Sequence, residues 1–319
     1  MKRIFAATAI ILLSAGIASA QDMAAVAEAY NNAANTLAMG QKAEALTQFE
    51  SVMEMAKALG EEGTEVVNNC KNVIPSLYLS VAKGYANNQD IDSAISSLEK
   101  AVSTGNEYGD TATAEEASGL IASLKSTQAM TKANALLNAK DYAGAAEAYK
   151  AIVAADPANA TAQLRLGMAL NGLADYDGAI AAFEQSLANT PETQQGTAKK
   201  QISNAYLKKA NTAYKAKDMK TALDAAQKSA EYVDNANAQK IAGHAALALK
   251  QYQVAATSYE AYLAMKPKAS DKVQITYQVA TAYQNLGDAG KACAYFQEIA
   301  QDPKWGEAAR YQITALKCN

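Results

Sequence analysis

The sequence is poor in the residues from which most active sites are built. Its 319 residues include one histidine, three cysteines and one tryptophan. The single histidine, His244, excludes a multi-histidine metal centre, and it has no nucleophile elbow nearby. No Cys-x-x-Cys pair occurs, which makes redox catalysis unexpected. We therefore predict a protein that is not an enzyme and that holds no metal and no cofactor.

The sequence also lacks a strong net charge of either sign. Its formal net charge is −3, whereas nucleic-acid-binding proteins are more often strongly basic. We therefore expect no nucleic-acid partner. The charge is nevertheless uneven, since residues 21–125 hold 6 basic and 15 acidic residues, and residues 126–319 hold 21 and 17. This division is compatible with head-to-tail self-association, and equally with two ordinary solvated surfaces.

Long apolar runs are absent except at the N-terminus. There, Lys2 and Arg3 precede the apolar run Ile4–Leu13, and Ala18-Ser19-Ala20 has the small-x-small pattern of a cleavage site. The run is too short to span a bilayer, which takes about 20 residues, and it is typical of a signal peptide. We predict that residues 1–20 are removed and that residues 21–319 are exported to the periplasm or outside the cell, with no integral membrane segment.

Proline is scarce, with five residues, while alanine, lysine, glutamate and glutamine are abundant. This composition predicts an all-helical protein. A chain of this length exceeds the size of one compact core, so two domains or a repeat array are expected. Residues 111–138 and 193–216 each read as one long helix. Pro75 lies within the helical pattern of residues 62–87, and there we expect a kink or break near Ser76.

A periodic pattern runs through nearly the whole of residues 21–319. A small residue recurs at intervals of 33 to 51 residues, and in six of the seven copies a large side chain follows it four positions later. The small residues are Ala45, Ala94, Ala145, Ala179, Ala222, Ala255 and Ala292; the large ones are Phe49, Leu98, Tyr149, Phe183, Tyr259 and Phe296, with Ala226 in the fifth copy.

This pattern resembles the tetratricopeptide repeat. The copy at residues 160–193 matches best, with Leu166, Gly167, Leu170, Ala179, Phe183 and Pro191 at the family's positions. The resemblance implies an all-α, right-handed superhelical solenoid of about seven helix-turn-helix repeats, the most regular at residues 126–303. In the fifth copy Lys209 replaces the expected leucine, so its register is the least secure.

The C-terminus has the features of a cap. After Pro303, residues 304–319 predict a solitary closing helix with a polar outer face, and Trp305 is expected to pack it onto the last hairpin. Cys293 begins the last helix of the array and Cys318 ends the cap, so the two are expected to form a disulfide if the protein is exported. Cys70 would then stay unpaired and buried between repeats.

In tetratricopeptide arrays the first helix of each repeat lines the inside of the superhelix. The resemblance therefore implies an inner groove rich in asparagine, glutamine and tyrosine, suited to an extended peptide. Solvated surface is the alternative for these residues, and a packed core position is the alternative for His244. The predicted groove residues are Asn134, Asn138, Arg165, Asn171, Asn204, Asn211, Tyr214, Lys240, His244, Gln274, Tyr277 and Gln284.

Some members of the family hold a peptide C-terminus in a carboxylate clamp, and here that clamp is incomplete. Asn134 and Lys208 fit its pattern, but Arg165 occupies an asparagine position. The leading hypothesis is therefore a non-enzymatic scaffold or adaptor of the cell envelope that binds a protein or peptide of unknown identity. The alternative is a structural protein that self-assembles through its acidic N-terminal and more basic C-terminal parts.

Overall fold

The computed structural model describes residues 17–318, and these residues form α-helices and short 3-10 turns with no strand among them. The predicted signal peptide lies largely outside the described residues, because α1 begins at Ile17. The described part of the chain contains no helix that is both long and apolar enough to cross a membrane. The all-α prediction is confirmed.

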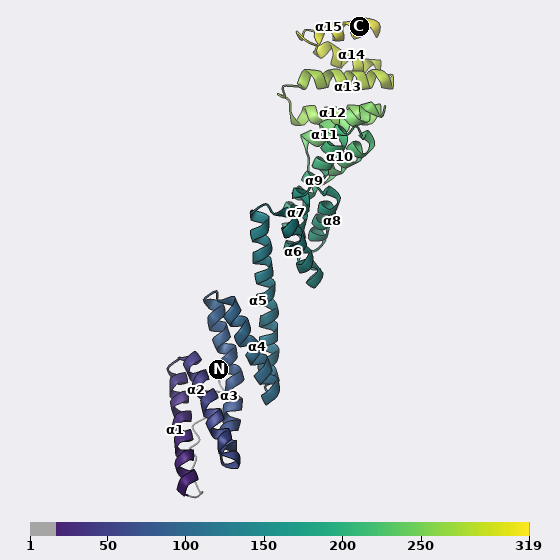
Figure 1. Cartoon of the computed structure of the whole chain (residues 1–319). Helices are drawn as coiled ribbons and strands as arrows, with labels where there is room; N and C mark the ends of the chain where they lie inside the picture. The colour runs from purple at the N-terminus through teal and green to yellow at the C-terminus, as the bar shows by residue number, and fades with distance from the viewer. Residues whose placement is uncertain (1–16, 319) are drawn as a thin grey trace. The chain divides into compact units, whose positions relative to one another are not determined.

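The helices are arranged as seven consecutive antiparallel hairpins and one closing helix in residues 17–318 (Figure 1). We call the first helix of each hairpin its A helix and the second its B helix. The pairs are α1 (Ile17–Ala38) and α2 (Lys42–Ala58), α3 (Thr64–Asn87) and α4 (Ile91–Tyr108), α5 (Thr111–Asn138) and α6 (Tyr142–Ala155), α7 (Ala160–Gly172) and α8 (Tyr176–Ala188), α9 (Gly196–Lys215) and α10 (Met219–Tyr232), α11 (Ala236–Ala248) and α12 (Tyr252–Met265), and α13 (Lys272–Leu286) and α14 (Ala289–Glu298), followed by α15 (Gly306–Ala315).

The chain divides into two compact units within α5, the first ending at Ala129 and the second beginning at Met130. Both long helices expected from the sequence are present, as α5 and α9. The short 3-10 turns Gly60–Gly63 and Glu192–Gln194 lengthen the connections after the first and fourth hairpins. The long intervals come mainly from long helices, since α3, α5 and α9 have 24, 28 and 20 residues whereas the two 3-10 turns have four and three.

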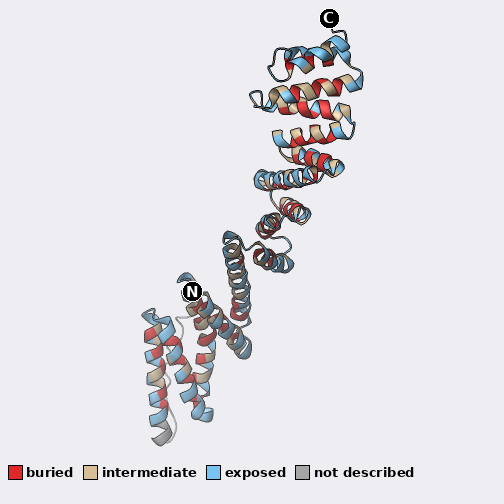
Figure 2. Ribbon diagram, turned by 45° about the horizontal axis from the view of Figure 1, so that its top comes forward, coloured by how far each residue is buried: buried red, intermediate tan, exposed pale blue. Residues whose placement is uncertain are grey.

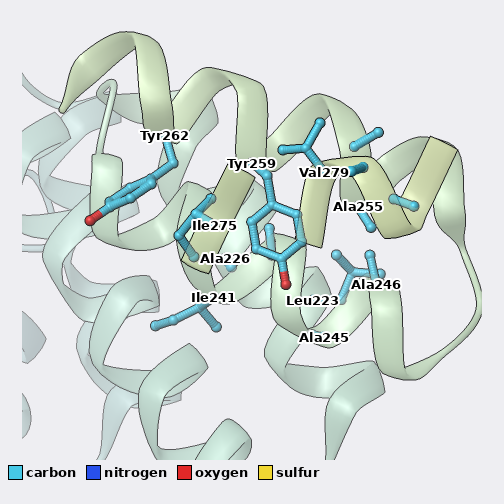
Figure 3. Close-up of a cluster of buried hydrophobic side chains, with 14 of the residues drawn as sticks. Leu223, Ala226, Ile241, Ala245, Ala246, Ala255, Tyr259, Tyr262, Ile275 and Val279 are labelled. Carbon is cyan, nitrogen blue, oxygen red and sulfur yellow. The ribbon is translucent and has the colours of Figure 1, made fainter. Parts of the chain in front are cut away.

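The core of each hairpin is built at the positions that the sequence pattern marks. All seven marker alanines are fully buried, and so is the residue four positions later in every copy. Figure 2 shows the buried residues concentrated where neighbouring helices face one another. In Figure 3 the ring of Tyr259 lies among Ala255, Val279 and Ala246, which come from three different helices. Burial of these apolar groups is the main stabilising contribution of each hairpin.

A second small residue makes room for the large one. It lies on the A helix sixteen positions before the large side chain, and it is buried in every hairpin. A Cβ atom added to Gly167 would lie 2.5 Å from the ring of Phe183, and one added to Gly243 would lie 2.5 Å from the ring of Tyr259. The residues at this position are Ala33, Ala82, Ala133, Gly167, Ala210, Gly243 and Ala280.

The fifth hairpin keeps the register although it lacks the large residue. Ala222 and Ala226 are both fully buried, as the pattern requires. The hydroxyl groups of Ser203 on α9 and Ser229 on α10 each donate to the other residue's backbone carbonyl at 2.8 Å. Lys209, at the position expected to be leucine, instead forms an ion pair with Asp177 of the preceding hairpin.

The turn between the A and B helices has one conformation in all seven hairpins. Five positions before each marker alanine the backbone φ is between +60° and +82°, in the left-handed region. Only two of these residues are glycine, which is the residue that tolerates this region best. The residues are Gly40, Gln89, Lys140, Ala174, Lys217, Lys250 and Gly287.

The residue after this turn caps the B helix. In five hairpins it is aspartate, whose carboxylate accepts a hydrogen bond from the backbone N–H three residues later. Such a bond satisfies one of the free N–H groups at a helix start. Gln41 and Gln251 occupy the same position in the first and sixth hairpins and make no such bond.

The break expected near Ser76 does not occur, because α3 continues from Thr64 to Asn87. Proline removes one backbone N–H donor and crowds the preceding turn. Here Pro75 is buried, and the Ser76 hydroxyl donates to the carbonyl of Val73 at 2.9 Å. Buried neighbours on both sides, among them Ile74 and Leu77, hold the helix in place by packing.

The C-terminal cap forms as a single helix. Trp305, which precedes α15, packs its ring 5.0 Å from that of Tyr277 on α13. A disulfide joins Cys293 of α14 to Cys318, with their Cα atoms 5.6 Å apart. Cys70 is a free, buried thiol on α3, and burial raises its pKa to about 12.

Candidate binding surface on the A helices

The predicted groove residues all belong to A helices of the second unit, residues 130–318. Four of them are exposed, namely Asn138, Asn204, Asn211 and Gln274. The remaining eight are half-buried, and their hydrogen bonds and ring contacts are described below. The structure therefore separates the set into residues that contact other parts of the chain and residues that face solvent.

Asn134 and Arg165 both serve the buried ring of Tyr149. The Tyr149 hydroxyl donates to Oδ1 of Asn134 at 2.5 Å. Burial raises the pKa of Tyr149, and the neighbouring Arg165 guanidinium, which hydrogen-bonds the same hydroxyl, acts in the opposite direction. A buried hydroxyl without a partner is costly, so these two polar side chains stabilise the third hairpin.

His244 likewise provides a hydrogen-bond partner for a buried tyrosine in the sixth hairpin. Its Nδ1 lies 2.7 Å from the hydroxyl of Tyr259, and its ring stacks on that of Tyr214 with 5.8 Å between centroids. Burial lowers the pKa of His244 and the nearby Lys240 ammonium lowers it further, while Asp271 raises it. The neutral imidazole can thus accept the hydrogen of the tyrosine. His244 is a packed residue rather than a free groove residue.

Lys240 is held in a small polar cluster with Asp271 and Tyr262. Its ammonium lies 3.0 Å from the Asp271 carboxylate and 5.2 Å from the centre of the Tyr262 ring. The Tyr262 hydroxyl donates to the same carboxylate at 2.6 Å. Burial and the adjacent carboxylate raise the pKa of Tyr262 to about 12. The cluster joins the sixth hairpin to the start of α13.

The other half-buried residues also connect neighbouring helices. Lys208 of α9 donates to the side chain of Asn171 on α7 at 3.2 Å. Gln284 of α13 donates to Gln312 of the cap at 2.9 Å, and Tyr277 packs against Phe296 and Trp305. These contacts run along the row of A helices and link one hairpin to the next.

The exposed side of α9 lies between its neighbouring A helices. Lys208 contacts α7 at one edge of this side, and Tyr214 contacts His244 of α11 at the other. The opposite side packs on B helices, through Lys209 to α8 and through Ser203 to α10. We call the exposed surface of α7, α9, α11, α13 and residues 130–138 of α5 the helix-A face. Asn204 and Asn211 are exposed at its centre.

A set of glutamate–tyrosine contacts between hairpins was not predicted from the sequence. In the first, fourth and sixth hairpins a glutamate directly follows the large B-helix residue, and it accepts a hydrogen bond from a tyrosine of the next hairpin. Glu260 accepts from both Tyr283 and Tyr295 at 2.8 Å. Glu184 accepts from Tyr232 at 3.1 Å, and Glu50 accepts from Tyr78. The recurrence of glutamate directly after the large B-helix residue is the sequence feature that could have predicted these contacts.

A cavity of about 300 Å³ opens where the fourth hairpin meets the fifth. Neutral hydroxyl and amide groups line it, among them Thr161, Asn189, Gln194 and Thr197, together with the apolar Leu164. The 3-10 turn at Glu192–Gln194 forms one side of it. No group of three or more His, Cys, Asp or Glu side chains suited to a metal ion occurs within residues 17–318.

Comparison with known families agrees with the repeat geometry. One tetratricopeptide repeat model matches residues 130–192, and a second matches residues 276–304. Residues 130–192 and 276–304 therefore match tetratricopeptide repeats. The first match begins where the second compact unit begins, and the second covers most of the last hairpin. No curated protein matches the chain.

Solved tetratricopeptide repeat structures resemble parts of the chain only loosely. A crystal structure of MamA is 21% identical over 57% of this chain and 94% of its own, with a TM-score of 0.38. YrrB, described as having an unusual peptide-binding site, is 19% identical over 57% and 90%, with a TM-score of 0.36. A thermophilic repeat protein of Thermus thermophilus is 18% identical over 61% and 100%, with a TM-score of 0.27. Similarities at this level carry no conclusion about what this chain binds.

Proposed function

We propose that this tetratricopeptide repeat protein is a non-catalytic scaffold that binds a segment of another protein on the helix-A face of its second unit. Repeats of this family serve as protein-interaction modules, which supports the general role. The specific face is our inference from the exposed polar residues of α9. The stacked hairpins bury their apolar seams against each other, so recognition depends on the side chains left exposed.

The observation that supports this proposal is that some A-helix asparagines bond within the chain while others are exposed. Asn134 is used within the chain to satisfy Tyr149, whereas Asn204 and Asn211 are exposed. An amide side chain both donates and accepts hydrogen bonds, so it can pair with the backbone of an extended segment. Two such residues lie seven positions apart on α9, which places them on one side of the helix.

Site-specific photo-crosslinking tests the location. A photoreactive residue is placed at Asn204 or Asn211, and matched controls carry it at Asp224 or Gln227, which are exposed on α10 of the same hairpin. After irradiation in extracts of the native cell, we expect discrete protein adducts from the two α9 positions alone. Equal adducts from α9 and α10 would contradict a ligand on the helix-A face.

Self-association is the second candidate, and the uneven distribution of charge favours it. Residues 21–125 carry a net charge of −9, and residues 126–319 carry a net charge of +4. Opposite charges on two parts of one chain favour head-to-tail contact between copies at low ionic strength. Sedimentation velocity at about 20 mM and about 500 mM salt, where the screening length falls from about 20 Å to about 4 Å, decides this. A monomer in both conditions removes the idea.

We also propose that the protein acts outside the cytoplasm after removal of residues 1–20. The N-terminal sequence pattern supports export, and the disulfide between Cys293 and Cys318 is compatible with an oxidising compartment. Intact-mass measurement of the protein from its native cell is the test. A mature chain beginning at Gln21 supports the proposal, and a chain that retains residues 1–20 in the cytoplasm contradicts it.

A further inference from the structure

The A helices of the second unit contain no acidic residue at all. All 17 Asp and Glu residues of the range 130–319 lie on B helices, turns, loops or the cap. The A helices of the first unit do contain acids, for example Asp22, Glu28 and Glu65. The A helices from Met130 onward nevertheless carry cations, which are Lys132, Arg165, Lys199, Lys200, Lys208, Lys209, Lys215, Lys240 and Lys272.

Helix α9 arranges three of these cations on a single exposed side. Lys200, Lys208 and Lys215 alternate with Asn204 and Asn211 at intervals of four, four, three and four residues, and all five side chains are exposed. At about 100° per residue these positions fall within roughly 80° of the helix circumference. We call these five residues the α9 stripe. Ammonium and amide groups therefore alternate along one line of the helix-A face.

No carboxylate of residues 17–318 forms an ion pair with the lysines of the stripe. Three other A-helix lysines are neutralised from outside their helix, since Lys209 pairs with Asp177, Lys240 with Asp271 and Lys272 with Glu298. Lys208 contacts only the neutral side chain of Asn171 among the described groups. The stripe thus places three exposed lysines without a carboxylate partner along one line; Lys132, Lys199 and Arg165 also form no ion pair within residues 17–318.

We propose that the ligand of the helix-A face is an extended acidic protein segment that lies along the α9 stripe. This inference rests on the binding function proposed above and adds the chemical class of the partner. At 1.5 Å per residue the three lysines are spaced about 12 Å and 10 Å apart along the helix. An extended chain advances about 3.3 Å per residue, so carboxylates at every third or fourth residue match the lysines. The intervening asparagines hydrogen-bond the ligand backbone.

A protein segment fits this surface better than a nucleic acid does. Single-stranded nucleic acids are held by exposed aromatic rings on which bases stack. The tyrosines of α9 are half-buried and already in contact, Tyr206 with Tyr232 and Tyr214 with His244. The alternation of ammonium and amide groups instead matches carboxylates that alternate with peptide groups.

Fluorescence polarisation with synthetic peptides tests the proposal on the full chain. The probe is a labelled 12-residue peptide with glutamate at every fourth position and serine elsewhere, and its twin has glutamine in place of glutamate. The test variant combines Lys200→Gln, Lys208→Gln and Lys215→Gln. The control variant combines Lys217→Gln, Lys220→Gln and Lys250→Gln, which removes the same charge from exposed lysines outside the A helices.

The expected result is specific loss of acidic-peptide binding. The glutamate peptide should bind about tenfold more tightly than its glutamine twin, and the test variant should lose about that factor, from three exposed charge pairs. The control variant should stay within about twofold. Replacing the three stripe lysines with arginine should preserve binding, and this variant separates loss of charge from loss of fold.

Several results would overturn the inference. Equal weakening in the test and control variants would mean that charge acts diffusely. Binding of a 12-nucleotide single strand with the same loss in the test variant would show a general polyanion site. Loss of peptide binding as the chain forms dimers would assign the stripe to a second copy. If the glutamine twin binds equally well and α9 crosslinking succeeds, the acidic partner is wrong but binding on the helix-A face is retained. If neither peptide binds and crosslinking fails, both proposals are wrong.

Discussion

The side chains of His244 and Tyr259 are a polar pair that repeats elsewhere in the chain. The two residues are 15 positions apart, and their polar atoms are 2.7 Å apart. Asn134 and Tyr149 have the same spacing and the same kind of contact, at 2.5 Å. In the fourth and seventh hairpins phenylalanine replaces the tyrosine, and Met168 and Thr281 stand at the partner positions. A tyrosine at the buried B-helix position therefore occurs with a polar partner on the A helix.

Replacement of His244 should lower stability most when the new residue cannot hydrogen-bond the Tyr259 hydroxyl. In His244→Ala the buried hydroxyl loses its partner, which should lower the free energy of unfolding by about 1–3 kcal/mol. His244→Asn should cost clearly less, because asparagine satisfies the equivalent tyrosine in the third hairpin. Urea denaturation of the variants measures the difference. Equal losses in both variants would contradict the role assigned to the pair.

The same histidine should make stability depend on pH. Its pKa in the folded chain lies below the ordinary value of about 6.5. Between these two values the unfolded chain binds more protons, so the free energy of unfolding falls as the pH drops through this interval. The stabilisation is fully present above about pH 6.5. Denaturation midpoints measured between about pH 5 and pH 7.5 should fall more steeply with acid for the wild type than for His244→Asn.

Gly167 should not tolerate a methyl group. Its Cβ would lie 2.5 Å from the Phe183 ring, so Gly167→Ala should lower the free energy of unfolding by about 1–3 kcal/mol. Adding Phe183→Leu should reduce the cost of the alanine. Gly119→Ala is the matched control on α5, where no atom lies within 4 Å, and it should stabilise by about 0.5–1 kcal/mol. Urea denaturation compares the three variants.

The hairpin turns offer sites at which stability can be increased. Lys140 and Lys217 adopt φ of 62° and 63°, and replacing either with glycine should stabilise by about 1 kcal/mol. Gly287→Ala, at the equivalent turn with φ of 81°, should destabilise by a similar amount. Gln251→Asp should add the missing helix cap and contribute about 0.5–2 kcal/mol. Thermal unfolding compares the four variants, and a loss of stability in both lysine variants would refute the argument.

Removal of the disulfide should act mainly on the cap. The bond closes a loop between residues 25 positions apart, for which the stabilisation is about 3 kcal/mol. In Cys293→Ser with Cys318→Ser, amide hydrogen exchange of α15 should accelerate, whereas that of α7 and α8 should not change. Trp305 is the only tryptophan, so its fluorescence reports the detachment directly. Uniform acceleration along the whole second unit would show that the bond stabilises more than the cap.

Most of the fold followed from the sequence because hairpin packing depends on residue size at fixed positions. Gly167 and Phe183, with four further matching positions, predicted the fourth hairpin. The break considered near Ser76 does not occur, since packing around α3 compensates for one lost hydrogen bond. The repeat pattern alone does not separate the A-helix polar residues that bond within the chain from those that are exposed. Asn134 and Asn211 stand at the same repeat position, and only the residue 15 positions later, a tyrosine or an alanine, distinguishes them.

The burial of Cys70 affects which cysteines can form a disulfide. A thiol whose pKa is raised to about 12 by burial stays almost entirely protonated at neutral pH. Since thiolate is the species that attacks a sulfur–sulfur bond, the folded first unit keeps its cysteine out of exchange chemistry. When the first unit is folded, Cys293 and Cys318 are therefore the two remaining cysteines, and no third thiolate competes for their disulfide.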